Sequence, residues 1–255
     1  MLDEAQLRRF PMLAASALPE AEKSHGSIIW TQLSTPGTLL LRLQHALHLF
    51  DYCAEEIAAT RVARHAARSQ RDPMQLSSDE SDAFISTLGR LHAWMWMAGR
   101  DGSFAIWDFV NTIESVRKNL LLCPTLVACI TMADLEELQD DIALAFPFCE
   151  EIRHAAAHEH DLRSSVRDRD KNAFSGEYRG FGVQTTANTK NGIIQGISGR
   201  SIGFTYRQQV VEYELSETTL DQLEVFRKRF NKLFAAAEAV TQNLMLAQMQ
   251  RRAPE

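Results

Sequence analysis

The sequence is poor in the features that mark secreted and membrane proteins. It has four cysteines among 255 residues, and no two of them form a CxxC pair. Such spacing supports neither a disulfide framework nor a zinc knuckle, so we expect reduced, mostly buried thiols. No run approaches the roughly 18 apolar residues that a membrane-spanning helix requires. The first residues are acidic where a signal peptide would be basic, and we therefore expect a cytoplasmic protein.

Proline and glycine are also scarce, at 7 and 12 residues, and no linker rich in either is visible. With 45% hydrophobic and 24% charged residues, the composition is that of a globular protein and excludes wholesale disorder. The net charge of -6 argues against a protein that coats nucleic acid through bulk charge. A small basic patch around a site remains compatible with that charge.

Apolar residues recur through most of the chain in steps of three and four, which predicts amphipathic helices. A short helix over 3–17, broken by Pro19 and Gly26, belongs to a predicted N-terminal cap over 1–35. The main predicted helices are 38–68, 79–98, 103–123, 131–156 and 216–244.

Glycine and proline predict where these helices stop or bend. Gly99 and Gly102 bracket a predicted turn between two helices, and Pro147 should kink the helix that contains it. Residues 69–78 and the charged stretch 163–170 are expected to be loops.

β-like runs between residues 176 and 215 predict a small antiparallel sheet of two or three strands. Asn191-Gly192 is a typical hairpin turn within it. The expected fold is therefore mainly α: an up-and-down bundle of about five helices with a small antiparallel β hairpin before the C-terminal helix. We assign residues 36–250 to this one domain, with the β insertion at about 176–215.

One polar segment, residues 150–161, stands out within the fourth main helix. It reads Glu-Glu-Ile-Arg-His-Ala-Ala-Ala-His-Glu-His-Asp. His154 and His158 are four positions apart and share a helix face, which points away from the apolar stripe through Ile152 and Ala156. We therefore expect the two histidines to be solvated or turned toward a partner subunit.

Arg153, a polar residue at 154, three further residues and His158 resemble the R-polar-xxx-H motif of HEPN domains. Over about 38–246, the long antiparallel helices, the late position of the motif and the closing helix are also similar to that family. The resemblance implies a homodimeric, metal-independent endoribonuclease without a cofactor, in a toxin or phage-defence setting. RNA and an antitoxin or other protein would be its partners. It makes Arg153 and His158 the catalytic pair, with His154 at the polar position beside them.

The chemistry fits these residue types. Histidine titrates near neutral pH and can move the 2′-hydroxyl proton of RNA, while arginine can hold phosphate oxygens bidentately. Arg153 and His158 lie about 140° apart on a helix, so the arginine arm or a local distortion must close the gap. A two-fold dimer would bring a second copy of each to the same cleft. The expected RNA-backbone ligands are Arg163, Arg167, Arg169 and Lys171.

A metal site is the first alternative. Four potential ligands step by four, four and three along one helix face, which is a competent stripe for zinc or iron inside a bundle. Further ligands would come from other helices, for which His45, His48 and His92 are candidates. The four residues of the stripe are Glu150, His154, His158 and Asp161.

A non-catalytic helical dimer or protein-interaction module is the second alternative. It would use the histidine face or the β hairpin to bind a protein. Trp94, Trp96 and Trp107, with Met95 and Met97, are then core or dimer-surface residues.

Overall fold

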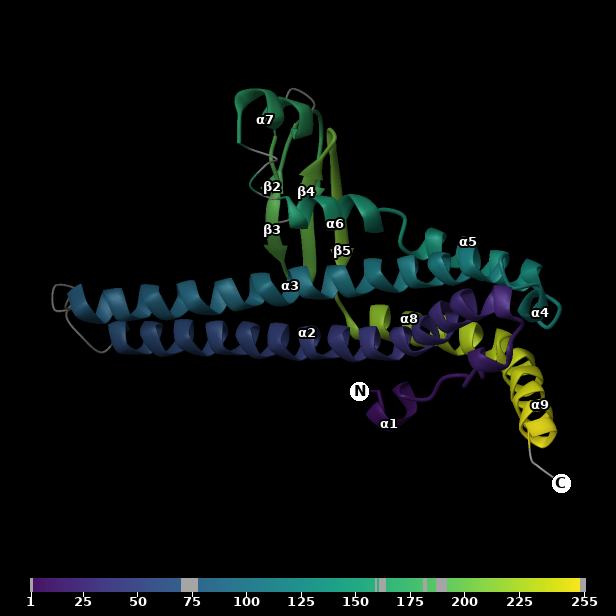
Figure 1. The fold of residues 1–255 in the computed structure, drawn as a ribbon. Coiled ribbons are helices and arrows are strands. Elements are labelled where there is room, and N and C mark those ends of the chain that lie inside the picture. Colours follow the sequence, from purple (N-terminus) through teal and green to yellow (C-terminus); the bar gives the residue numbers. More distant parts are fainter. Residues whose placement is uncertain are drawn as a thin grey trace. The chain divides into compact units, whose positions relative to one another are not determined.

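The computed structural model is mainly α-helical, with a small antiparallel sheet before the last two helices (Figure 1). This confirms the expected fold class. The structure describes residues 2–69, 78–158, 160, 164–180, 183–186 and 192–252. None of the described helices is long and apolar enough to cross a membrane.

The chain divides into two compact units, and each is assembled from separated stretches. The first unit comprises Met1–Arg42, Phe104–Glu150 and Glu217–Glu255. The second unit comprises Leu43–Ser103 and Glu151–Ser216. Two long helices pass from one unit into the other, so neither unit is a simple N- or C-terminal domain.

The strands lie between α7 and α8 in the chain. The helices are α1 (Glu4–Leu7), α2 (Lys23–Ser69), α3 (Ser78–Leu120), α4 (Pro124–Val127), α5 (Met132–Ala145), α6 (Cys149–Ala157), α7 (Val166–Asn172), α8 (Glu217–Leu233) and α9 (Ala235–Arg252). Two 3-10 helices, η1 (Ala15–Ala17) and η2 (Glu20–Glu22), precede α2. The strands are β1 (Arg179–Gly180), β2 (Val183–Gln184), β3 (Gln195–Ser198), β4 (Ser201–Tyr206) and β5 (Gln209–Glu214).

Helix α2 begins at Lys23 rather than near residue 38, so it runs through the boundary expected at residue 35. Gly26 and Gly37 lie inside it because the N-terminal segment packs closely against the helix at both positions. A Cβ atom on Gly37 would lie 1.9 Å from the backbone oxygen of Leu7, and one on Gly26 would lie 2.3 Å from Leu18 Cδ1. These glycines provide close approach between segments and do not end the helix.

The turn expected between Gly99 and Gly102 does not form, because α3 continues through both residues. In the second unit, the β segment packs against these glycines. A Cβ atom on Gly99 would lie 3.2 Å from Ile197 Cδ1, and one on Gly102 would lie 3.2 Å from Leu215 Cδ1. The missing side chains let the sheet approach the helix, and tertiary packing offsets the low helix propensity of glycine.

Two expected helices are each divided in the structure. Pro147 breaks its helix instead of kinking it: α5 ends at Ala145 and α6 begins at Cys149. The last helix divides at Phe234, which is fully buried between α8 and α9. The apolar stripe of the sequence crosses both breaks, so its periodicity alone did not reveal them.

The main sheet has three antiparallel strands in the order β3-β4-β5, as expected. Phe204 on β4 lies opposite Val211 on β5, and both are buried. The ring of Phe204 packs on Trp96 of α3, with 5.6 Å between the ring centroids. Arg200, in the turn between β3 and β4, forms an ion pair with Asp51 of α2 at 2.7 Å. Strand β4 is therefore the buried centre of the sheet, held against the helices of the second unit.

Helices α2 and α3 run side by side in opposite directions (Figure 1). In the second unit, Cys53 and Ile57 of α2 form a buried cluster with Leu91 of α3. In the first unit, Arg42 of α2 forms an ion pair with Asp108 of α3 at 2.9 Å. All four cysteines are free thiols, and Cys53 and Cys123 are buried, as expected.

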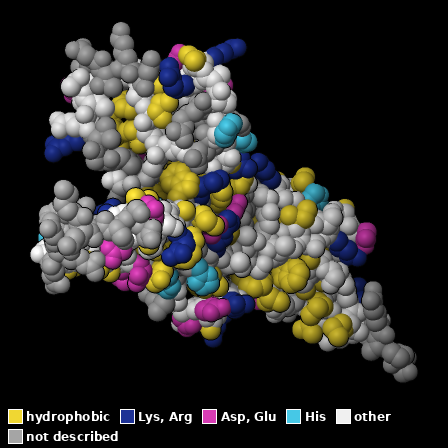
Figure 2. All heavy atoms as spheres, turned by 90° about the vertical axis from the view of Figure 1, so that its left-hand side faces the viewer, with side chains coloured by type: hydrophobic (Ala, Val, Ile, Leu, Met, Phe, Trp, Pro, Cys, Tyr) yellow, Lys and Arg dark blue, Asp and Glu magenta, His cyan; other side chains and the backbone are white. Residues whose placement is uncertain are grey.

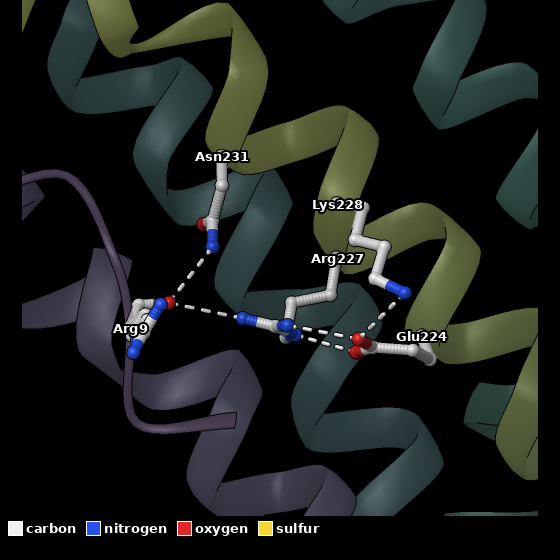
Figure 3. A network of polar contacts seen from close by, with 5 residues as sticks. All are labelled: Arg9, Glu224, Arg227, Lys228 and Asn231. Atoms are coloured by element: carbon white, nitrogen blue, oxygen red, sulfur yellow. Dashed lines mark hydrogen bonds and ion pairs between the residues drawn. The ribbon is translucent and has the colours of Figure 1, made fainter. Parts of the chain in front are cut away.

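Hydrogen bonds beside a buried ion pair of α8 join the N-terminal segment to this helix in the first unit (Figure 3). The guanidinium of Arg227 donates two hydrogen bonds to Glu224 and one, of 3.0 Å, to the backbone oxygen of Arg9. Asn231 donates to the same oxygen at 3.2 Å, and Lys228 lies 3.3 Å from Glu224. These bonds hold the segment that follows α1 on the surface of α8.

Candidate functional site

Helix α6 presents the motif identified in the sequence. Its buried side is formed by Ile152, Ala155 and Ala156. The backbone N–H of His158 donates to the oxygen of His154 at 3.0 Å, so the helical hydrogen bonding extends one residue past the last α6 residue. His154 is half-buried and His158 is exposed, which agrees with the prediction that neither belongs to the core.

The charged stretch that was expected to be a loop contains helix α7. Ser165 caps it by accepting a hydrogen bond from the backbone N–H of Asp168. The hydroxyls of Ser165 and Ser164 donate to the Asp168 carboxylate, and these hydrogen bonds lower the pKa of Asp168. The serines at the start of the stretch therefore favour a helix, although its mixed charges had predicted a loop.

Asn172, at the end of α7, positions the turn between β4 and β5. Its side-chain oxygen accepts from the backbone N–H of Arg207 at 3.2 Å, and its backbone oxygen accepts from Gln208 at 3.3 Å. Arg207 and Gln208 have φ values of 48° and 66°. Two successive residues with positive φ form the tight turn of a two-residue hairpin, usually made by Asn-Gly. Asn172 thus stabilises a turn in which Arg207 and Gln208 adopt positive φ values that their side chains disfavour.

These elements enclose a pocket of about 260 Å³ in the second unit. Two imidazoles, two cationic side chains, a carboxylate, an amide and a phenol line it. The lining residues are His154, His158, Lys171, Arg207, Asp168, Asn172 and Tyr206. Histidine side chains lie at the surface, with lysine and arginine side chains nearby, on the upper part of the face in Figure 2.

The ring of His154 lies near two other aromatic rings of the pocket, those of His158 and Tyr206. The ring centroids of His154 and His158 are 6.1 Å apart, and those of His154 and Tyr206 are 6.5 Å apart with planes only 3° from parallel. The guanidinium carbon of Arg207 lies 5.0 Å from the centroid of the Tyr206 ring. The pocket therefore combines groups that transfer protons, bind anions and stack on flat rings.

The structure does not bring all predicted site residues together. Arg153 is half-buried on α6 and is not among the residues that line the pocket. Because α6 is a regular helix there, no distortion closes the angle of about 140° between Arg153 and His158.

Of the predicted RNA-backbone ligands that the structure describes, only Lys171 lines the pocket. Arg167 and Arg169 are exposed on α7, and Arg169 lies 3.5 Å from Asp170 in an ion pair. Arg163 lies outside the described residues.

The metal alternative gains no support in the described part of the chain. There, no group of three or more histidine, cysteine, aspartate or glutamate side chains could hold a metal ion. Glu150 is exposed, and Asp161 lies outside the described residues, as does the first half of the Asn191-Gly192 turn. His45, His48 and His92 are exposed on α2 and α3.

Sequence reasoning missed Asn172, Tyr206 and Arg207. Tyr206 and Arg207 lie far along the chain from the motif, and the packing of the sheet beside α6 and α7 brings them to it. Asn172 reaches the pocket as the last residue of α7. The strands that end at Tyr206 and begin at Gln209 are separated by two residues, the length of a tight hairpin turn. Arg207 and Gln208 are not usual turn residues, so the sequence carried no clear signal for this turn.

A second pocket, of about 320 Å³, lies in the first unit. Its lining holds two cations, Arg229 and Lys232, and two carboxylates, Asp134 and Glu137. Arg229 pairs with Asp141 at 2.6 Å and with Glu137 at 3.6 Å. Because its charge is already matched within the protein, this pocket is a weaker candidate for an anionic substrate.

Comparisons of the chain with protein-family models, with curated protein sequences and with solved structures find no match. The resemblance to HEPN domains therefore remains an expectation from the sequence motif.

Proposed function

We propose that this chain is a HEPN-like, metal-independent endoribonuclease whose active site is the pocket formed by α6, α7 and the β4–β5 turn. The observation that carries the proposal is the pairing of two imidazoles with two cationic side chains in one pocket. RNA can be cleaved without a metal when a base removes the 2′-hydroxyl proton and cations stabilise the phosphate that it attacks.

His158 is assigned the proton-transfer role because it is exposed at the pocket and carries an imidazole. Lys171 and Arg207 are assigned to the phosphate, where their charges offset the negative charge that develops during attack. His154 lies between His158 and Tyr206 and supports the orientation of both rings.

One histidine cannot be base and acid in the same step, so the proposal includes a second copy of the chain. In a two-fold dimer, Arg153 and His158 of the two copies could share a cleft, which is the role that the HEPN resemblance gives Arg153. Helix α9 carries exposed apolar side chains on one face, at Met245, Leu246 and Met249, which favours association through helices.

The test is cleavage of single-stranded RNA in the presence of EDTA by wild-type protein and by His158→Ala. We expect at least a hundredfold loss in the variant, because positioned acid–base groups contribute about 10² to 10⁴ in rate. His48→Ala is the matched control, since His48 is an exposed histidine on α2 away from the pocket lining. Its activity should equal that of the wild type.

Equal cleavage by wild type and His158→Ala would overturn the proposal. Loss in His158→Ala with full activity in Arg153→Ala would keep the nuclease but remove the role taken from the HEPN motif. Lack of cleavage by wild-type dimers would favour the non-catalytic interaction module, for which the apolar face of α9 is the candidate surface.

A further inference from the structure

The nearly parallel rings of His154 and Tyr206 line the same pocket. Their planes differ by 3° and their centroids are 6.5 Å apart, with both rings lining the same pocket. A flat aromatic ring that lines a pocket is a surface on which a nucleobase of any kind can stack.

Two cationic side chains line the same pocket as these rings. The Arg207 guanidinium lies 5.0 Å from the Tyr206 centroid, and Lys171 lines the same pocket. Sequence-tolerant proteins bind single strands in this way, with aromatic rings for the bases and cations for the phosphates. A paired base inside a duplex could not enter, because its faces are covered by its neighbours.

We propose that His154 and Tyr206 form a subsite that holds one unpaired nucleobase of single-stranded RNA beside the phosphate held by Lys171 and Arg207. This inference depends on the proposed function for the identity of the nucleic acid. It adds that the substrate is single-stranded and that Tyr206 is a binding residue. The Asn172 hydrogen bond to Arg207 keeps the end of β4 in place for this role.

The experiment measures binding of a short 2′-O-methylated oligouridine by fluorescence anisotropy. This probe resists cleavage because its 2′-oxygen carries no proton. A second probe has the same length and charge but lacks the bases. We expect the wild type to bind the base-bearing probe about 5- to 100-fold more tightly, since stacking on one aromatic side chain has this effect.

Three variants show whether the ring of Tyr206 causes the preference. Tyr206→Leu should abolish it, and Tyr206→Phe should retain it because the ring remains. Tyr52→Leu changes an exposed tyrosine on α2 and should bind both probes like the wild type. Circular dichroism confirms that each variant is folded.

Equal binding of the two probes by wild type, or an unchanged preference in folded Tyr206→Leu, would overturn the subsite. The two proposals can fail separately. RNA cleavage that depends on His158 without a base preference would leave the nuclease and remove the subsite. A base preference without any cleavage would leave the subsite and remove the nuclease.

Discussion

At the scale of single residues, Glu224 is a buried carboxylate outside the pocket whose ionisation affects the stability of the fold. Burial alone would raise its pKa, but hydrogen bonds and ion pairs with Arg227 and Lys228 outweigh that effect and lower the pKa below its ordinary value of 4.5. A carboxyl group whose pKa is lower in the folded state stabilises the fold above its unfolded pKa. That stabilisation is lost as the pH falls through the folded pKa.

Replacing Arg227 by methionine should therefore destabilise the protein at neutral pH. We expect a loss of roughly 2 to 4 kcal/mol in the free energy of unfolding by urea, because Glu224 keeps only Lys228 as a cationic partner. Repeating the measurement at progressively lower pH should shrink the difference, since Glu224 no longer needs a cationic partner once it is protonated.

Arg229→Met on the same helix serves as the comparison. Arg229 is partly exposed and pairs with Asp141 and Glu137 at the surface. Its loss should cost below about 1 kcal/mol. Equal effects of the two substitutions would show that the Arg227 pair contributes no more than a surface ion pair.

At the scale of elements, both long helices contain glycines, although glycine has a low helix propensity. Gly37 of α2 is buried against the N-terminal segment, where the backbone oxygen of Leu7 occupies the space of a side chain. Gly89 of α3 is exposed, and a Cβ atom there would meet nothing within 4 Å. The same substitution should therefore have opposite signs at the two sites.

Gly37→Ala should lower the free energy of unfolding by about 1 to 3 kcal/mol, because the segment around Leu7 must move to admit the methyl group. Gly89→Ala should raise it by about 0.5 to 1 kcal/mol, since alanine is the better helix former. Thermal or urea unfolding of both variants tests this pair. A stabilising Gly37→Ala would contradict the close approach of Leu7.

At the scale of the whole molecule, the net charge of -6 limits how RNA can be held. Attraction must come from the pocket, whose cations are Lys171 and Arg207, because the overall field repels a polyanion. Binding should therefore involve few phosphates and depend only moderately on salt.

We expect the logarithm of the binding constant for single-stranded RNA to fall with the logarithm of salt concentration at a slope of about -1.4, as two neutralised phosphates require. Anisotropy titrations at several salt concentrations measure the slope. Lys171→Gln should reduce its magnitude by about half. A much steeper slope for the wild type would indicate a longer basic path that includes Arg167 and Arg169.

The sequence by itself determined the mainly helical class, the antiparallel strands before the last helices and the position of His154 and His158 outside the core. Each of these follows from periodicity within a short stretch, where neighbours along the chain are also neighbours in space. The helix starts predicted at residues 79 and 216 each lie one residue from the starts of α3 at Ser78 and of α8 at Glu217.

Only the tertiary structure decided the continuity of α3 through Gly99 and Gly102, the early start of α2 and the break at Pro147. At the glycines, contacts with distant segments outweigh local propensity. The same holds for the candidate site. The sequence predicted the two histidines, whereas only the folded structure shows that Asn172, Tyr206 and Arg207 line the same pocket. Contacts between residues tens of positions apart leave no periodic pattern, so sequence spacing alone could not predict which side chains share the pocket.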